Sequence, residues 1–479
     1  MRKVIYIDEP SLDRARKRNE CSFNFSYSYF PSEELKNYLN GKKFFIRTYG
    51  CQANLRDEEI MSGLLSDLGM VKCSKKEDCD LAIINTCAIR ENAEDKAFGE
   101  IGEFKSLKRK NKDLILMACG CMVEQKHIVD KILTTYEYLD IIFGTHNISN
   151  LIKILDLYIK NRCRYVDVSS KVGDIVENLP SLRKEKFRAF VNIAYGCDKF
   201  CTYCIVPFTR GKERSRKVED IIKECKLLVD EGYKEITLLG QNVDSYGKDF
   251  ENEIDFAYLL EKVAQLGIPR LRFLTSYPSD FKDDVIEVMS RYPNIMKFIH
   301  LPIQSGSNNI LRLMARHYTV EEYLSLVQRI RDKIPSMAFS TDIIVGFPNE
   351  SEEDFLETIN LVKKMNYISA FTFIYSPRKG TPAAKIEDSV SYKEKLARFK
   401  TLVSTLEIDV AKNASALVDK IYPVLVEGVS KKNSNMLSGI LENCKVVNFK
   451  GSPDLIGKII NVKITESHVY SLSGEICDE

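Results

Sequence analysis

The chain has 479 residues, enough for several domains, and its 70 Lys and Arg residues nearly balance 68 Asp and Glu residues, for a net charge of +2. This balance neither demands nor forbids a nucleic-acid partner, whose site would need locally clustered basic residues. The lack of 18 consecutive apolar residues and of an apolar leader excludes a membrane span and a signal peptide, so we expect a cytoplasmic protein without a membrane partner. In that compartment, 14 cysteines predict metal ligands, reactive thiols or small buried residues, and not disulfides.

The first part of the chain predicts an α/β domain. Residues 1–41 are charged and aromatic without clear periodicity, and we interpret them as an N-terminal extension. In residues 42–160, apolar runs at 44–48, 81–85 and 114–118 have the composition of buried parallel strands, and the segment after the second run repeats apolar residues at helical spacing. This β-α-β alternation is typical of a domain with a parallel sheet.

Residues 161–182 are mixed and polar and predict a linker, and a second β-α alternation fills residues 183–416. Its six candidate strands are separated by helical segments and lie at 189–195, 235–240, 270–275, 297–304, 339–347 and 370–376. Six such units predict a partial (β/α) barrel, and a doubly wound sheet is the competing arrangement. Residues 417–479 are β-rich with glycine turns and predict a small β-barrel.

Three cysteines follow the first strand of the central domain, in the stretch YGCDKFCTYCIVP. A loop at this place lies at the carboxyl end of its strand, where such folds place their sites. Cys197, Cys201 and Cys204 have a spacing at which thiolates can ligate three irons of a [4Fe–4S] cluster, which leaves the fourth iron open for a ligand. Two alternatives stay open at this point: a zinc site completed by a distant residue, and three buried cysteines.

Another set of three cysteines lies in the first domain; in chain order it is the first cysteine set, and residues 197, 201 and 204 form the second. Cys51, Cys87 and Cys121 each follow a predicted strand within about three residues of its end. Because parallel strands end at one edge of a sheet, we expect the three thiols to converge there. Cys119 is so close to Cys121 that spacing alone does not exclude it as a member of this set.

At this point the chain resembles a known family. YGCDKFCTYCIVP resembles the radical S-adenosylmethionine signature, and TYGCQAN, NTCAIRENAEDKAFGEIG and GCMVEQ resemble the N-terminal motifs of the methylthiotransferases. The stretch NTCAIRENAE is most similar to the tRNA-2-methylthio-N6-dimethylallyladenosine synthases, and the last sixty residues resemble a TRAM domain, an RNA-binding β-barrel. The resemblance extends from about Lys43 to the C-terminus. It implies an enzyme that transfers a sulfur-containing group, a radical S-adenosylmethionine methylthiotransferase.

The resemblance implies two [4Fe–4S] clusters and S-adenosylmethionine as cofactors. Cys197, Cys201 and Cys204 would hold the radical-generating cluster, whose open iron binds S-adenosylmethionine. Cys51, Cys87 and Cys121 would hold an auxiliary cluster with an open iron for the sulfur that is transferred, and Cys119 has no counterpart in the family's motif.

The resemblance also implies that two segments, each following a strand, contact the cofactor. Without the resemblance, each segment would be interpreted as an ordinary turn. Gln241 and Asn242 belong to the first segment, and Gly346 and Glu350 to the second. Asp342 precedes the second segment, and a contact to a ribose and a hydrogen bond inside the core are both open for it.

The run RGKERSRK carries basic residues shortly after the three-cysteine loop. A solvated loop is the usual interpretation of such a run, and contact with RNA phosphates is the alternative. The candidates for this RNA contact are Arg210, Lys212, Arg214, Arg216 and Lys217. In the TRAM-like segment, Ile440 stands where relatives usually have Arg, and Ile440→Arg is therefore expected to tighten RNA binding.

The function that the resemblance implies is methylthiolation of C2 of N6-dimethylallyladenosine next to the anticodon of a tRNA, with S-adenosylmethionine as radical source and methyl donor. The expected partners are a tRNA, bound through its anticodon stem-loop, and an electron donor such as flavodoxin or ferredoxin. Alternatives are methylthiolation of threonylcarbamoyl-adenosine in tRNA or of a ribosomal protein aspartate, and more distantly a non-enzymatic iron–sulfur RNA-binding sensor. No catalytic residue is predicted beyond the cluster ligands.

Overall fold

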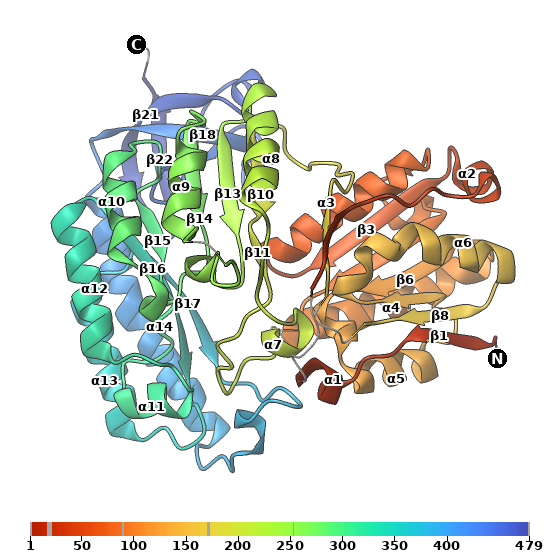
Figure 1. Ribbon diagram of the computed structural model, residues 1–479. Helices are drawn as coiled ribbons and strands as arrows, with labels where there is room; N and C mark the ends of the chain where they lie inside the picture. The colour runs from red at the N-terminus through yellow and green to blue at the C-terminus, as the bar shows by residue number, and fades with distance from the viewer. Residues whose placement is uncertain (1, 17–21, 89–90, 170–172, 252, 478–479) are drawn as a thin grey trace. The chain divides into compact units, whose positions relative to one another are not determined.

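The computed structural model describes residues 2–16, 22–88, 91–169, 173–251 and 253–477 (Figure 1). None of the helices in these ranges combines the length and apolarity that a membrane crossing requires. The chain forms two compact units, and each takes up segments that are discontinuous in sequence. The first consists of residues 1–184, 194–200 and 204–216, and the second of residues 185–193, 201–203 and 217–479.

The first unit is built on a parallel sheet whose strand order is β1-β8-β7-β6-β5-β3-β4. Its central strands are buried on both sides, as parallel strands covered by helices must be. In chain order the strands are β1 (Val4–Asp8), β3 (Lys43–Tyr49), β4 (Val71–Lys72), β5 (Leu81–Thr86), β6 (Ile115–Cys119), β7 (Ile141–Phe143) and β8 (Arg164–Asp167). The three strands predicted from the sequence of this domain are β3, β5 and β6.

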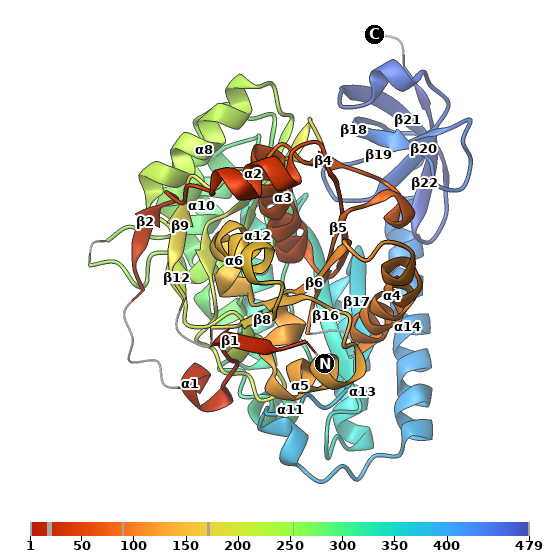
Figure 2. The ribbon, with the colours of Figure 1, turned by 90° about the vertical axis from the view of Figure 1, so that its right-hand side faces the viewer.

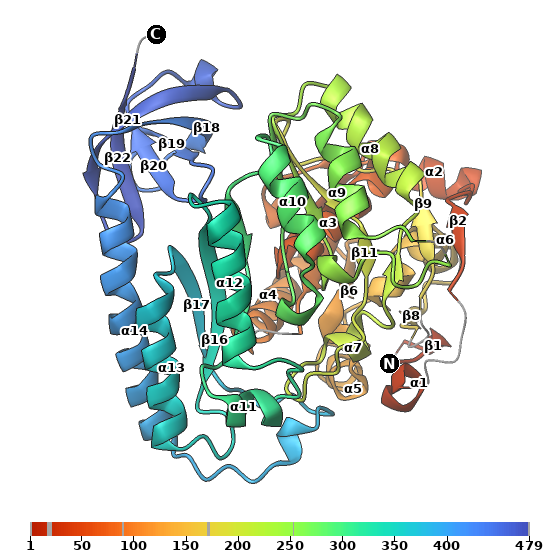
Figure 3. The same cartoon turned by 60° about the vertical axis from the view of Figure 1, so that its left-hand side comes forward.

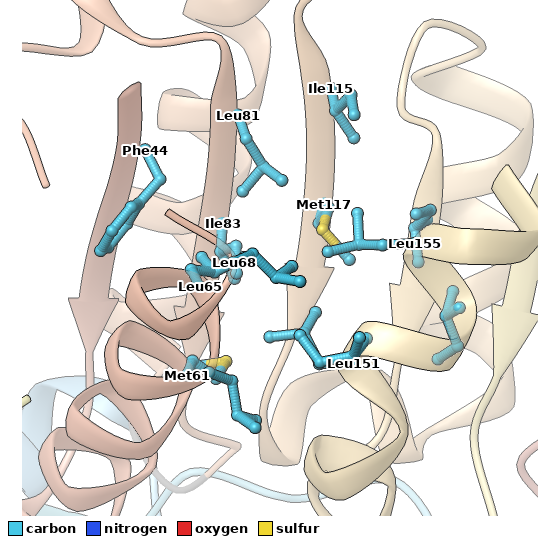
Figure 4. Packing of buried hydrophobic residues seen from close by; sticks show 14 of the residues in the cluster. Phe44, Met61, Leu65, Leu68, Leu81, Ile83, Ile115, Met117, Leu151 and Leu155 are labelled. Atoms are coloured by element: carbon cyan, nitrogen blue, oxygen red, sulfur yellow. The ribbon is translucent and has the colours of Figure 1, made fainter. Parts of the chain in front are cut away.

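Helices cover both faces of this sheet. One core layer contains side chains of α2, α3 and α6, and Figure 4 shows Leu65 of α3 and Leu151 of α6 in the same cluster as Met117 of β6, on opposite sides of it. The other layer contains side chains of α4 and α5. The helices of this unit are α1 (Leu12–Arg16), α2 (Glu33–Leu39), α3 (Gln52–Asp67), α4 (Glu91–Lys110), α5 (Lys126–Thr135), α6 (Leu151–Asn161) and α7 (Val206–Thr209). Short 3₁₀ helices η1 (Lys76–Asp78), η2 (Cys121–Glu124) and η3 (Thr145–Asn150) complete it.

The segments interpreted as an N-terminal extension and a linker contribute to this unit. Strand β1 pairs in parallel with β8, so the sheet extends beyond the predicted limits of the domain at both ends of the sequence. Strands β2 (Asn24–Ser26) and β9 (Ile175–Glu177) pair with each other. Strands of three to five residues are too short to show a periodicity, which is why the sequence pattern did not indicate them.

The second unit contains the six strands predicted for the central domain. Two parallel three-stranded ladders, β10-β13-β14 and β15-β16-β17, follow one another in chain order, and a parallel bridge between Leu271 and Ile295 adjoins the first ladder. The strands are β10 (Arg188–Asn192), β13 (Glu235–Leu239), β14 (Arg270–Phe273), β15 (Phe298–His300), β16 (Ala338–Val345) and β17 (Ser369–Ile374). Sequential strand order is that of a partial (β/α) barrel, whereas a doubly wound sheet reverses its order.

Helices alternate with these strands, and α12, α13 and α14 lie side by side next to β16 and β17 (Figure 3). The start of α13 follows from the local sequence, because the hydroxyl of Ser351 accepts a hydrogen bond from the backbone N–H of Asp354. The helices are α8 (Val218–Asp230), α9 (Phe256–Ala264), α10 (Asp283–Arg291), α11 (Asn308–Leu313), α12 (Val320–Lys333), α13 (Glu352–Met365) and α14 (Tyr392–Ser415).

Helix α14 leads into a closed five-stranded barrel with the strand order β18-β19-β20-β22-β21 (Figure 2). Its strands are β18 (Ile421–Val429), β19 (Leu437–Ile440), β20 (Val446–Phe449), β21 (Ile459–Ser467) and β22 (Ser471–Ile476). Within the second unit, buried Arg270 of β14 donates hydrogen bonds to the backbone oxygens of Ile440 (2.9 Å) and Pro423 (2.7 Å) and so fixes the barrel to the half-barrel.

The side chain of Ile440 lies at this junction and is only 9% exposed. It packs with Phe187 and Leu425. This burial argues against an RNA-facing position, and therefore against the expectation that Ile440→Arg strengthens RNA binding.

We expect Ile440→Arg to destabilise the protein, because a guanidinium without a partner would replace a packed apolar side chain. The loss should be about 2–4 kcal/mol. Thermal unfolding followed by circular dichroism measures it, and Ile421→Arg is the matched control, since Ile421 lies on the same barrel and is 56% exposed. Equal melting temperatures for the two variants would contradict the packing described here.

Candidate iron–sulfur site

The first cysteine set lies at the carboxyl ends of three adjacent strands. Cys51 follows β3 and is the N-cap residue of α3, Cys87 follows β5 directly, and Cys121 begins η2 after β6. Gly120 makes the last placement possible: its φ is 97°, and a Cβ atom there would lie 2.4 Å from the backbone oxygen of Thr86. The turn that carries Cys121 therefore lies against the end of β5.

A buried amide pair holds the ends of β3 and β5 together. The Asn85 side chain, which is fully buried, donates to the backbone oxygen of Asn54 (2.8 Å) and to Oγ1 of Thr48 (3.3 Å). The side-chain oxygen of Asn54 in turn accepts from the backbone N–H of Cys51 (3.3 Å). The loop that carries Cys51 is thereby fixed to the strand that precedes Cys87.

The environment of Cys51 favours its thiolate. A hydrogen bond from Cys87 lowers the pKa of the Cys51 thiol to about 6, against the opposing effect of burial, and the charge of Arg210 and backbone N–H groups of Ala53 and Asn54 add to the lowering. The last two donors are the free N–H groups at the start of α3, where a negative charge is favoured. Cys51 and Cys87 are thus in contact, and a thiolate is the form that binds iron.

Cys121 lies close to the same charges. Burial raises the pKa of its thiol, and Arg210 opposes this by donating from Nε to Sγ at 3.2 Å. Arg210 is itself only 6% exposed and is paired with Asp57 of α3, with Nη2 and Oδ2 2.6 Å apart. A buried cation of this kind compensates negative charge on neighbouring thiolates.

Cys119 points into a different environment. Its side chain belongs to the core layer beneath α3 and α6, and Sγ lies 3.6 Å from Sδ of Met61. Burial raises the pKa of this thiol well above its usual value. The sequence spacing left Cys119 and Cys121 as alternatives, and the structure gives Cys121 the hydrogen bond from Arg210, whereas Cys119 contacts Met61.

The donor set has the chemistry of an iron–sulfur site, because thiolates are the ligands that such clusters take. Three thiols at one sheet edge, beside a buried arginine and a helix N-terminus, have the chemistry that such an anionic group requires.

The second cysteine set lies on the loop between β10 and α7. In the first unit, β11 (Ala194–Tyr195) pairs with β12 (Arg214–Ser215), and the backbone N–H of Cys197 donates to the oxygen of Gly211 at 3.2 Å. Gly196 has a φ of 77°, and a Cβ atom there would lie 2.1 Å from the oxygen of Lys212, so the loop requires glycine.

Cys204 belongs to the same unit as the first cysteine set. Ile205, the next residue, is buried and packs with Ala88 and Cys121. The thiol-bearing loop at Cys204 is therefore a direct neighbour of the turn that carries Cys121.

In the second unit, a buried arginine lies against Cys201. Arg316 places Nη1 3.6 Å from Sγ of Cys201 and donates from Nη2 to the backbone oxygen of Pro302 at 2.8 Å. Its guanidinium also lies 4.1 Å from the ring centroid of Tyr277. Each cysteine set thus has one buried arginine against one of its thiols, although the partners of these arginines differ.

Two of the candidate cofactor residues have structural partners. The Glu350 carboxylate, 3% exposed, pairs with Arg398 of α14 at 2.9 Å and accepts from the backbone N–H of Gly346 at 2.8 Å. Burial raises the pKa of Glu350. This arrangement argues for a turn held by an internal ion pair and against direct cofactor contact by Glu350.

The other cofactor candidates lie near the carboxyl ends of their strands. Asn242 is buried and donates to Asp280 at 2.6 Å, and its neighbour Gln241 is partly exposed. Asp342 is partly exposed on β16, and its Oδ1 lies 3.5 Å from Nε2 of His300. Gln241 and Asp342 are therefore partly accessible to a ligand, whereas the Asn242 side chain, like that of Glu350, is buried and has an internal partner.

The structure divides the basic run into two groups. Arg210, Arg214 and Arg216 are buried, and Arg216 pairs with Glu177 at 2.6 Å. Burial and ion pairing argue against RNA contact by these three arginines. Lys212 and Lys217 are exposed and keep their place as candidates.

Sequence reasoning missed several residues of this site. No local signal marks Asp57 and Arg316, whose partners are distant in the sequence. Asn85 lies in the predicted strand, and an asparagine in an otherwise apolar run was a usable sign of a specific hydrogen bond.

Three family models match the chain, and together with the geometry they define its class. The Radical SAM superfamily model matches residues 191–362, the Uncharacterized protein family UPF0004 model matches residues 43–144, and the TRAM domain model matches residues 416–477. A half-barrel with three cysteines after its first strand, matched by the first of these models, is a radical SAM protein, a class that implies S-adenosylmethionine and a [4Fe–4S] cluster.

Solved structures and curated relatives agree with this class. A structure of the radical S-adenosylmethionine methyltransferase TsrM from Kitasatospora setae matches with a TM-score of 0.52 and 12% identity, over 72% of this chain and 75% of that one, which shows the fold alone. A protein of Anoxybacillus flavithermus is 50% identical over 98% of this chain and 89% of its own length, and one of Bacillus subtilis is 49% identical over 100% and 94%. Both are named tRNA-2-methylthio-N(6)-dimethylallyladenosine synthase, and the chain belongs to that family.

Asp244 lies in η4 (Val243–Ser245), which follows β13, and its carboxyl group is buried. Its ionisation should make the stability of the protein depend on pH. Burial raises the pKa of its carboxyl to about 8, against a hydrogen bond from the backbone N–H of Tyr277 at 2.8 Å. A carboxyl with a raised pKa holds its proton more tightly in the folded state, so stability falls as the pH rises from about 4 to about 8.

We therefore expect Asp244→Asn to raise the melting temperature by on the order of 5 °C at pH 8.5 and by less at pH 5. Asp332→Asn, at an exposed position of α12, is the control and should show no such difference. If Asp244→Asn raised the melting temperature equally at both pH values, the carboxyl group of Asp244 would not have the raised pKa described here.

Proposed function

We propose that this protein inserts a methylthio group at C2 of N6-dimethylallyladenosine, next to the anticodon of a tRNA, with S-adenosylmethionine as radical source and methyl donor. The observation that carries the proposal is the match, over nearly the whole chain, to synthases named for this product. The packing of Ile205 against Cys121 supports it, because a reaction that joins radical chemistry to sulfur transfer needs the two cysteine sets close together.

In this proposal each cysteine set holds one [4Fe–4S] cluster. Cys197, Cys201 and Cys204 bind the one that receives S-adenosylmethionine, and residues 51, 87 and 121 bind an auxiliary one. When bound, these cofactors supply the radical and sulfur chemistry, as cofactors do in general. The chain contributes thiolates held in place and compensating charge from the buried arginines Arg210 and Arg316, which contact Cys121 and Cys201.

The tRNA partner would be held partly by charge. Lys212 and Lys217 are exposed next to the cysteine loop in sequence, and the C-terminal barrel matches a TRAM model. Phosphate contacts of this kind make affinity fall steeply with salt concentration. An electron donor such as flavodoxin or ferredoxin would reduce the cluster on Cys197, Cys201 and Cys204. The reaction would take place in the cytoplasm.

Replacement of the first cysteine set separates the two proposed clusters. We expect the variant with Ala at Cys51, Cys87 and Cys121 to cleave S-adenosylmethionine under reducing conditions but to form no methylthiolated product. Cys119→Ala is the matched control, because its thiol packs against Met61, and it should keep both activities. Iron content, 5′-deoxyadenosine and product nucleoside are the three readouts. If Cys119→Ala loses iron and Cys121→Ala does not, the ligand assignment is wrong.

A comparison of substrates tests the proposed reaction itself. Reconstituted enzyme is given anticodon stem-loops with a prenyl group, with a threonylcarbamoyl group or without modification, and in a fourth reaction ribosomal protein. We expect strong preference for the prenylated stem-loop, because burial of the prenyl carbons contributes ~0.8 kcal/mol per methylene. Equal turnover of the threonylcarbamoyl substrate, turnover only on protein, or no cleavage of S-adenosylmethionine at all would each overturn the proposed function.

A further inference from the structure

Arg210 has an unusual position for a residue of a basic run. It comes six residues after Cys204 in the sequence, yet its side chain is buried in the first unit beside the other cysteine set. Its Nε donates to Sγ of Cys121 at 3.2 Å, and its Nη2 lies 2.6 Å from Oδ2 of Asp57. A single guanidinium therefore contacts a candidate ligand and a carboxylate at the same time.

The two partners of Arg210 belong to the elements that carry the first cysteine set. Asp57 lies in α3, which begins directly after Cys51, and Cys121 begins η2. The planar guanidinium, with donors in fixed directions, links the two elements in a way that a lysine ammonium does not reproduce. Thr145 also joins the segment of Arg210 to η2: its Oγ1 donates to the backbone oxygen of Thr209 and lies 3.0 Å from the carboxylate of Glu124 in η2.

We propose that Arg210 is a positioning residue for the auxiliary iron–sulfur cluster, whose ligand Cys121 it orients and whose negative charge it compensates. This inference rests on the proposed function, since it needs a cluster on Cys51, Cys87 and Cys121. It assigns Arg210 a role inside the site in place of the RNA contact that the basic run indicated.

The physical argument concerns both charge and geometry. Three thiolates at one buried edge repel one another, and the repulsion is strong where water is excluded. A hydrogen bond from a cation to a cluster sulfur also stabilises the reduced state, because hydrogen bonds and nearby charge set the reduction potential of such clusters. Loss of the Arg210 charge should therefore make the cluster harder to reduce and its ligand Cys121 less well oriented.

A matched control lies in the same segment. Arg216 is equally buried and pairs with Glu177 at 2.6 Å, so its loss disturbs a comparable ion pair. Since Arg216 pairs with Glu177 of β9, Arg216→Gln should reproduce the structural cost of losing a buried arginine while the contact between Arg210 and Cys121 stays in place.

The experiment uses the full chain with Cys197, Cys201 and Cys204 replaced by Ala, so that only the first set can hold a cluster. Arg210→Gln, Arg210→Lys and Arg216→Gln are added singly, and each protein is reconstituted with iron and sulfide without oxygen. The readouts are the midpoint potential from a redox titration followed by electron paramagnetic resonance, the rate of iron release to a chelator, and the melting temperature.

We expect Arg210→Gln to move the midpoint to a more negative potential and to release iron about tenfold faster, as loss of an outer-shell partner does at metal sites. Arg210→Lys should shift the midpoint in the same direction by less, and Arg216→Gln should leave it at the value of the parent. If Arg210→Gln does not fold, the shift of the midpoint potential in Arg210→Lys tests the proposal instead.

A midpoint unchanged by either Arg210 variant, or an equal shift in Arg216→Gln, would overturn the proposal while leaving the proposed function intact. Absence of any cluster in the parent with Arg210 in place would overturn the two-cluster function, and the role of Arg210 with it.

Discussion

The site of this protein depends on one constraint: strands of a parallel sheet end at the same edge. Cys51, Cys87 and Cys121 are far apart in the sequence, and each follows a strand of the order β3-β5-β6. Strand alternation alone would place Cys119 and Cys121, two residues apart, on the same face. The chain instead leaves β6 after Cys119, and Gly120, with a φ of 97°, turns it so that Cys121 begins η2. Cys119, the last residue of β6, turns into the core layer with Met61, and Cys121 turns toward Arg210.

Buried charge is the second determinant of the site. Thiolates at a dry sheet edge are costly unless cations or N–H groups face them. The chain supplies both, through the start of α3 at Cys51 and through Arg210, which Asp57 holds in place. Arg210 arrives on the segment that follows the three-cysteine loop, so one short stretch of chain serves both cysteine sets.

The sequence was sufficient for the elements whose patterns are local. Long apolar runs predicted β3, β5 and β6 and all six strands of the half-barrel, and the strand ends then predicted where the first cysteine set converges. Short strands such as β1 and β8 lacked a readable period and were assigned to an extension and a linker. The boundaries of the first domain were therefore drawn too narrowly around its sheet.

Charged residues were harder to interpret for a different reason. A run such as RGKERSRK has the same composition whether it is solvated or buried, and only its partners decide between the two. Those partners, Asp57 and Glu177, lie far from the run in sequence and in elements that the run does not adjoin. The same holds for Ile440, whose burial against Phe187 follows from the docking of the barrel and not from its motif.

The central claim is that this protein, through its two cysteine sets, methylthiolates a prenylated adenosine in tRNA. The most direct measurement is mass spectrometry of nucleosides from the tRNA of cells with the gene, without it, and without it but carrying the gene on a plasmid. The account predicts that deletion removes 2-methylthio-N6-dimethylallyladenosine, that N6-dimethylallyladenosine accumulates in its place, and that the plasmid restores the methylthio group. An unchanged level of the methylthiolated nucleoside in the deletion strain would contradict it.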